Sequence, residues 1–423
     1  MKRFLKRLAA FVLVAAAAGY LLVFWPVRDK HPSVRLAVGA IAVRGATIYV
    51  SPDKPPLNDA TLVARNGRIT AVGTLVTVPA DAQALPCRGC AITAGFWNTH
   101  VHFTEAKWLN AAWQRREKLN AQLADMLTSR GFVTVADLGS DLRVTVSLRR
   151  RIETGDLNGP FIYTAGSPLY PEDGIPFYLR ETMPKYILML MLQPSTPAAA
   201  VRDEERNIRT GADVLKLFTG SHVERGSIKP MREDIARAAA ELAHQHGQLA
   251  FAHPSNLEGI AVALSSGVDV LAHAPDTTDG INDALIAEMA RKATLIPTLK
   301  MFATTVTKNS AFLDPIYDVV RRFHAQGGSL MFGTDVGYMT DYSTADEFAA
   351  LEKCGLSSTD ILRMLTITPA TRFGVAAQKG TLEPSKLADF VVLSSDPARD
   401  VKAFADVQAT VRSGKIIWRS ASE

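Results

Sequence analysis

The most constraining feature of the sequence is the alternation, from residue 91 onward, of short apolar runs with longer amphipathic runs. Short runs bounded by turn residues predict strands, and the runs between them predict helices. The eight predicted strands are 91–102, 133–138, 161–165, 214–218, 249–253, 268–273, 294–299 and 330–335. This repeat predicts an α/β protein with a (β/α)8 TIM barrel. The alternative is an open doubly wound sheet, but no glycine-rich nucleotide loop follows its first strand.

The two ends of the chain carry strand-like runs with no helices between them. Residues 36–82 alternate in hydrophobicity, with Asn66-Gly67 at a predicted hairpin turn, and similar runs return at 388–393 and 411–418. We expect both ends to build one small β-sandwich beside the barrel. The predicted domains are an N-terminal anchor or signal with its linker (1–34), the first part of the sandwich (35–88), the barrel (89–375) and the second part of the sandwich (376–423).

Polar residues end several of the predicted barrel strands, and this is where barrel enzymes place their active sites. The first strand ends in His100-Val-His102, and residues two apart on a strand point to the same face, as two ligands of one metal would. Alone, this motif is a weak signal. Buried charges are costly unless paired or bound to metal. The full set of strand-end residues therefore predicts a metal centre: His100, His102, Lys216, His253, His273 and Asp335.

This pattern resembles the metal-dependent amidohydrolase superfamily, from about residue 40 to the C-terminus, and most closely its imidazolonepropionase-like and prolidase-like branch. Further matching segments are Gly333-Thr-Asp-Val-Gly337 and residues 380–397. The resemblance implies that His100 and His102 bind the more buried metal, and that His253 and His273 bind the more exposed one. It also implies that Lys216 is carboxylated to a CO2-derived carbamate, and that Asp335 binds the buried metal and acts as the catalytic proton shuttle.

The implied cofactors are two divalent metal ions. Nitrogen and oxygen ligands suit zinc best, with manganese, cobalt and iron open. The implied reaction is cleavage of a C–N bond by a metal-bridging hydroxide, on a small amide such as a dipeptide or an N-acylated amino acid. The alternatives are a mononuclear cyclic-amide hydrolase, a lactone or phosphoester hydrolase on the same site, and a binding protein that keeps the fold without activity. Asn256 stands where deaminases of the superfamily carry Glu, and Asn98 where Asp is common.

The third strand–helix unit is irregular, because about fifty residues separate its strand from the next. Long excursions from a barrel loop are commonly functional, so residues 166–197 are predicted to form a lid or substrate wall. Tyr170 and Tyr178 are its candidate substrate contacts, and His222 is a further one, with a solvated loop histidine as the alternative. The run 186–192 predicts a buried helix, or else a contact with lipid or an apolar substrate.

The N-terminus carries four basic residues followed by an uncharged run, 8–25. Its length fits a spanning helix, and Trp25 suits a membrane interface. We expect an uncleaved anchor in the inner membrane, with the catalytic domain in the periplasm; the alternative is a cleaved signal and a secreted or periplasmic protein. A net charge of +5 without a basic stripe argues against nucleic acid as a partner. A homo-oligomer remains open.

The chain has three cysteines. Cys87 and Cys90 form a C-x-x-C motif, for which a local disulfide and two free thiols are both open, depending on the compartment. One such pair is too few for a structural zinc site. Cys354 is expected to be a buried small hydrophobic residue.

Overall fold

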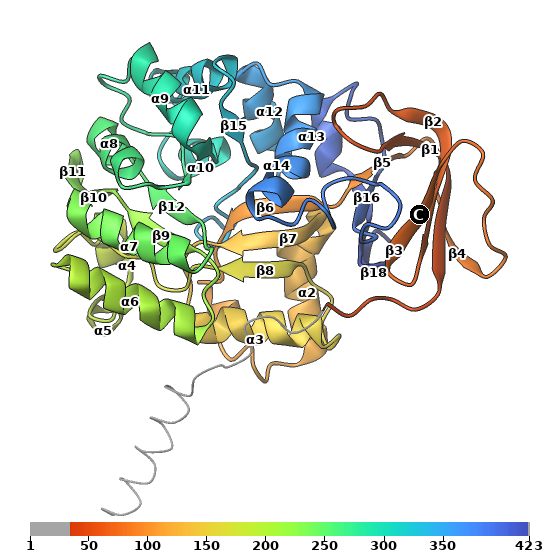
Figure 1. Ribbon diagram of the computed structural model, residues 1–423, viewed down its shortest axis with the longest axis horizontal. Helices are drawn as coiled ribbons and strands as arrows, with labels where there is room; N and C mark the ends of the chain where they lie inside the picture. The colour runs from red at the N-terminus through yellow and green to blue at the C-terminus, as the bar shows by residue number, and fades with distance from the viewer. Residues whose placement is uncertain (1–33, 422–423) are drawn as a thin grey trace, which may run out of the picture.

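The computed structural model describes residues 34–421 and consists of a (β/α)8 barrel with a small β domain beside it (Figure 1). Within this range, no helix is both long enough and apolar enough to cross a bilayer. The predicted anchor, residues 8–25, lies outside the described residues.

The barrel is built from parallel strands in two hydrogen-bonded groups, of three and of five strands. Isolated bridges join the groups, Leu169 with Leu217 on one side and Val101 with Val336 on the other. The predicted fold is thus confirmed. The strands are β6 (Phe96–Val101), β7 (Phe132–Asp137), β8 (Phe161–Thr164), β9 (Leu215–Phe218), β12 (Ala250–His253), β13 (Val270–Leu271), β14 (Thr294–Leu295) and β15 (Ser329–Leu330).

Helices surround the barrel and bury their apolar faces against it (Figure 1). Several begin at a side chain that accepts a backbone N–H, such as the capping box formed by Ser357 and Asp360. They are α2 (Arg116–Met126), α3 (Leu142–Glu153), α6 (Pro197–Thr210), α7 (Glu233–Gln245), α8 (Leu257–Ser265), α9 (Asp283–Lys292), α10 (Leu299–Thr305), α11 (Ser310–Ala325), α12 (Ala345–Lys353), α13 (Ser358–Leu365) and α14 (Ile367–Arg372).

The small domain is one eight-stranded sheet that contains both ends of the described chain. Its order is β18-β17-β16-β5-β1-β2-β3, with β4 pairing on β1. Asn66 and Gly67 both have positive φ at the β2–β3 turn, as the sequence predicted. The strands are β1 (Ala40–Tyr49), β2 (Leu57–Arg65), β3 (Arg68–Gly73), β4 (Ala82–Leu85), β5 (Ala91–Ala94), β16 (Phe390–Leu393), β17 (Val407–Arg412) and β18 (Lys415–Arg419).

The run predicted as the first barrel strand is two strands that meet at Gly95. β5 pairs with β1 and β16 in the small sheet, whereas β6 pairs with β7 in the barrel. The Gly95 N–H donates to the carbonyl of Asp389 (2.9 Å), and a Cβ at Gly95 would lie 2.5 Å from Cγ2 of Val133. A residue without a side chain is needed where the chain passes from one sheet to the other.

The excursion after β8 forms α4 (Phe177–Thr182) and α5 (Lys185–Leu188) and packs against an unpredicted hairpin, β10 (Gly220–Glu224) and β11 (Ser227–Pro230). The expectation that residues 186–192 form a buried helix was wrong. Tyr186, Met189 and Leu190 are 68%, 85% and 73% exposed. Helix α5 has only four residues, and the first buried residue after it is Leu192. The Leu192 carbonyl accepts the Tyr170 N–H (2.8 Å).

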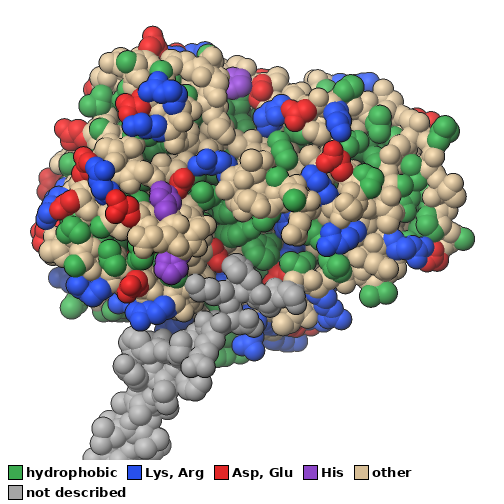
Figure 2. Space-filling model, viewed as in Figure 1, with side chains coloured by type: hydrophobic (Ala, Val, Ile, Leu, Met, Phe, Trp, Pro, Cys, Tyr) green, Lys and Arg blue, Asp and Glu red, His purple; other side chains and the backbone are tan. Residues whose placement is uncertain are grey.

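The structure also shows the state of the three cysteines and the distribution of charged side chains on one face. Cys87 and Cys90, whose state the sequence left open, are joined by a disulfide. Cys354 is a buried free cysteine, as expected. Figure 2 shows Lys and Arg side chains interspersed with Asp and Glu over one face of the molecule, rather than gathered in a stripe. Interspersed charges of both signs give that face no strong field of one sign.

Candidate metal centre

β6 contains His100 and ends one residue before His102, and it is hydrogen-bonded to the segment that carries Asp335. Asn98 donates from Nδ2 to Thr334 Oγ1 (2.7 Å), while its Oδ1 accepts the N–H groups of His100 and Thr334, each at 3.2 Å. An amide can donate and accept at once, which a carboxylate cannot. Asn98 therefore serves as a polar link between β6 and the segment that follows β15.

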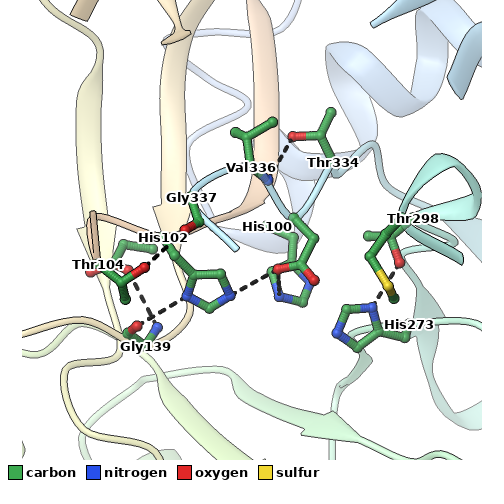
Figure 3. A network of polar contacts seen from close by, with 12 residues as sticks. His100, His102, Thr104, Gly139, His273, Thr298, Thr334, Val336 and Gly337 are labelled. Carbon is green, nitrogen blue, oxygen red and sulfur yellow. Dashed lines mark hydrogen bonds and ion pairs between the residues drawn. The ribbon is translucent and has the colours of Figure 1, made fainter. Parts of the chain in front are cut away.

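Asp335 lies directly opposite the two histidines of β6. Its Oδ1 is 3.3 Å from Nε2 of His100 and 2.9 Å from Nε2 of His102 (Figure 3). Asp335 has a φ of 59°, an uncommon left-handed conformation, and its N–H donates to the His100 carbonyl (2.9 Å). Two residues on, Gly337 has a φ of +100°, and a Cβ there would lie 1.8 Å from the His102 carbonyl oxygen. This close backbone approach aims the carboxylate at the imidazoles.

The other two histidines come from the paired strands β12 and β13: His253 ends β12, and His273 lies two residues after β13. Ligand atoms of His100, His273 and Asp335 all lie within 4.8 Å of one another, and all three residues are buried. The His253 ring is 4.5 Å from the His273 ring and stacks on the Phe218 ring at 4.7 Å. All four predicted histidines and Asp335 therefore converge in space from strand ends far apart in the sequence.

Hydrogen bonds on the outer side of two rings fix which nitrogen faces inward. Thr298 Oγ1 lies 2.7 Å from His273 Nδ1 and 2.8 Å from the Pro297 carbonyl, so a hydroxyl proton directed to that carbonyl leaves its oxygen to accept from Nδ1. His102 Nδ1 lies 3.0 Å from the carbonyl of Gly139, which can only accept (Figure 3). In both residues Nε2 is therefore the atom available to a metal, the arrangement expected of metal-ligating histidines.

Burial sets the protonation of the histidines. It lowers the pKa values of His100, His253 and His273 well below the ordinary range, and neighbouring positive charge adds to this effect. At His102, burial also lowers the pKa, but the hydrogen bond and the charge of Asp335 outweigh it and raise the pKa overall. Neutral imidazoles are the form that binds metal, so three of the four are ready to bind at neutral pH.

Lys216, on β9, is buried at the same place. Among the described residues its Nζ finds no hydrogen-bond partner. Burial lowers the pKa of its side chain to about 7. A buried ammonium without a partner is costly, whereas a neutral amine, or a carbamate that binds cations, fits the position. The donor set of imidazole nitrogens, one carboxylate and this lysine is thus compatible with divalent metal ions.

The three predicted substrate contacts are near this centre. The buried Tyr170 ring lies 4.5 Å from the Phe218 ring. Burial raises the pKa of Tyr178, as do nearby charges that include Asp335 and Asp276, and its ring is 5.7 Å from that of Tyr338. His222 Nε2 is 2.9 Å from Asp276 Oδ2, so it is a paired rather than a solvated histidine.

The sequence did not point to several residues that contact the candidate ligands or His222, namely Thr298, Phe218, Gly139 and Asp276. Thr298 and Gly139 each come soon after an apolar strand, so the strand-end rule could have suggested them. Nothing local indicated that Asp276 would meet His222. Asn256 caps a helix, because its side chain accepts the Gly259 N–H (2.9 Å) at the start of α8.

Comparison with known proteins identifies the family. The sequence profile of the amidohydrolase family matches residues 91–417. The chain belongs to the amidohydrolase family. Like other amidohydrolases, it is a metal-dependent hydrolase that acts on carbon–nitrogen bonds, and the match confirms the superfamily expected from the sequence.

The individual relatives have low sequence identity to this chain. The amidohydrolase is 22% identical over 390 residues to an imidazolonepropionase of Thermoplasma acidophilum, covering 85% of this chain and 89% of that one. A solved structure described as a candidate prolidase, from Bifidobacterium longum, is 26% identical with a TM-score of 0.75, covering 90% and 95%. A structure of a Xaa-Pro dipeptidase with bound methionine in the active site is 19% identical, with a TM-score of 0.76 and coverage of 90% and 100%. The last of these shows similarity of fold alone.

Proposed function

We propose that this amidohydrolase cleaves the amide bond of a dipeptide or an N-acylated amino acid. The observation that carries the proposal is the placement of one Asp335 oxygen, 3.3 Å from Nε2 of His100 and 2.9 Å from Nε2 of His102, with His273 in the same buried cluster. The prolidase relative supports a short peptide substrate.

The proposed cofactors are two divalent metal ions, with zinc the best match to nitrogen and oxygen ligands. His100, His102 and Asp335 would hold one ion, His253 and His273 the other, and a carbamate on Lys216 would join them. Such ions, when bound, lower the pKa of water and polarise a carbonyl group. The orphaned Nζ of Lys216 is the feature of the described chain that most favours the carbamate.

Carboxylation of Lys216 needs only carbon dioxide. The lone pair of the neutral amine forms a bond to the carbon of CO2, one C=O bond opens to give the carboxylate, and the nitrogen loses one proton to solvent. The pKa of Lys216, lowered by burial to about 7, keeps a large share of the amine neutral at physiological pH. The product is a longer side chain that ends in two oxygens, the ligand type that hard cations prefer.

The remaining residues bind substrate and move the proton. Asp335, held at its left-handed φ, is placed to accept a proton from the attacking water and to pass it to the leaving nitrogen. His222, oriented by Asp276, is the proposed polar contact to substrate. Tyr170 and Tyr178 are proposed to form the wall against a small, partly apolar substrate.

The second candidate is a mononuclear hydrolase of a cyclic amide. It is favoured by the compact group of His100, His273 and Asp335, which would suffice for one ion, and by the imidazolonepropionase relative. In that case Lys216 would stay an uncarboxylated amine. The number of metal ions bound per chain at saturation distinguishes the two candidates.

The test of function is a substrate panel. Metal-reconstituted protein is incubated with dipeptides, N-acyl amino acids, cyclic amides, lactones and phosphotriesters, and product formation is measured. We expect turnover of dipeptides or N-acyl amino acids, and loss of that turnover in Asp335→Asn. Turnover confined to lactones or phosphotriesters would overturn the amide assignment, and turnover confined to cyclic amides would favour the second candidate.

For localisation, we propose that residues 8–25 hold the enzyme in the inner membrane with the barrel in the periplasm. The disulfide between Cys87 and Cys90 supports an oxidising compartment, because such bonds are rare where thiols are kept reduced. A cleaved signal would give the same compartment without the anchor.

A further inference from the structure

A buried carboxyl group from a neighbouring helix holds the turn behind His273. Glu347 lies in the first turn of α12 and is buried. Its Oε1 accepts the Leu299 N–H (3.0 Å) and its Oε2 accepts the Lys300 N–H (2.6 Å). Both oxygens are thereby committed to the first two amides of α10, which have no acceptor within their own helix.

The residue immediately before these two amides is Thr298, the hydrogen-bond partner of His273. Thr298 has φ 49° and ψ 46°, a left-handed conformation that is an outlier for a β-branched residue. Such a backbone persists only where its surroundings hold it. The Glu347 carboxyl group, by fixing residues 299 and 300, holds the peptide that follows Thr298 and so keeps the Thr298 hydroxyl 2.7 Å from Nδ1 of His273.

We propose that Glu347 is a positioning residue for the metal centre: it acts through Thr298 to fix the orientation and tautomer of His273. The proposal rests on the proposed metal site, and it adds to that site a side chain from helix α12, which contacts the turn that holds His273. Support of this kind commonly changes metal affinity by about 10–100-fold when it is removed.

Lys300 reinforces the same junction in the opposite direction. Its buried Nζ donates to the carbonyl of Ser343 (2.7 Å) and pairs with the carboxylate of Asp341 (2.8 Å). α12 therefore holds the start of α10 through Glu347, while α10 holds the loop before α12 through Lys300. These two reciprocal contacts restrict the conformation of the turn at Thr298. A restricted turn is what is needed to hold His273 in one orientation.

The test compares metal affinity in variants of matched size. Glu347→Gln keeps the shape of the side chain but turns an amide NH2 toward a backbone N–H, so one of the two hydrogen bonds is lost. We expect this variant to bind Zn2+ about 10–100-fold more weakly than the unaltered protein, in competition with a chromophoric chelator. We also expect a changed visible spectrum after Co2+ substitution. Glu352→Gln, exposed on the same helix, is the control and should leave both readouts unchanged.

Thr298 variants separate positioning from folding. Thr298→Val removes the hydroxyl and should weaken Zn2+ binding as Glu347→Gln does, while Thr298→Ser keeps the hydroxyl and should restore most of the affinity. Because both side chains act on one ligand, Glu347→Gln combined with Thr298→Val should cost little more than either change alone. Additive losses, or a lower melting temperature of the metal-free protein with unchanged Zn2+ affinity, would overturn the proposal.

These readouts do not depend on the substrate. Failure of every amide in the substrate panel would remove the proposed reaction and leave the Zn2+ measurement standing. Absence of Zn2+ and Co2+ binding by the unaltered protein would instead remove the metal centre, and the role of Glu347 with it.

Discussion

Lys216 combines full burial with a side-chain nitrogen that has no hydrogen-bond partner among the described residues. If a carbamate on this nitrogen joins the two ions, Lys216→Ala should lower kcat/KM by about 100-fold or more, since metal-site support is lost along with one ligand. Short carboxylic acids such as acetate or propionate should restore part of the activity by occupying the vacated space. Steady-state kinetics with and without the acid provide the measurement.

A lysine on the outside of the barrel provides the control for this prediction. Lys292 is exposed on α9, where it pairs with Glu288. Lys292→Ala should leave both activity and metal content unchanged. A fully active Lys216→Ala protein, or a single metal ion per chain at saturation in the unaltered protein, would contradict the bridging role.

Among the helices, α6 contains a buried carboxyl group that the chemistry does not use. Glu204 accepts one hydrogen bond from Asn207 (3.1 Å), and its other oxygen has no partner among the described residues. Burial raises the pKa of Glu204 to about 8 from an ordinary value of 4.5. Between these values the unfolded chain binds fewer protons than the folded one, so the free energy of unfolding falls as pH rises from about 5 to about 8.

The variant Glu204→Gln should abolish this part of the pH dependence, because an amide does not ionise. The change in the free energy of unfolding caused by this variant should be more favourable at pH 8 than at pH 5, by about 1–4 kcal/mol. Urea unfolding at several pH values measures this, with the exposed neighbour Glu205→Gln as the control. Parallel pH profiles for the Glu204 variant and the unaltered protein would show that the carboxyl group does not carry the effect.

The elements were predictable from the sequence where a local pattern determines them. The eight barrel strands follow from short apolar runs, and the candidate ligands lie within or soon after five of these runs. The break at Gly95 was not predictable, because it depends on contacts with Val133 and Asp389. Likewise, the pairing of His222 with Asp276 joins residues 54 positions apart. Burial of the run 186–192 failed as a prediction because hydrophobicity alone does not say which surface a short helix meets.

At the scale of the whole molecule, the short linker of residues 26–33 would keep the described domains near any membrane that held residues 8–25. At about 3.5 Å per residue, it spans at most roughly 28 Å. We expect the full-length protein to remain in the membrane fraction after carbonate extraction and to be accessible to protease in spheroplasts. A chain that begins at residue 26 should be released and should keep its activity. Recovery of the full-length product as a soluble, N-terminally trimmed protein would indicate a cleaved signal instead.

The seam that closes the barrel is also where the candidate metal ligands meet. The Thr99 N–H donates to the Phe332 carbonyl and the His102 N–H to the Val336 carbonyl, each at 2.8 Å, across a separation of more than 230 residues. Contacts of such long range form late, after the intervening chain has been made and ordered. A ribosome must therefore have synthesised the last barrel strand before His100, His102 and Asp335 can act together. Translation products that end before Asp335 would therefore lack the candidate metal centre, even when His100 and His102 have already been made.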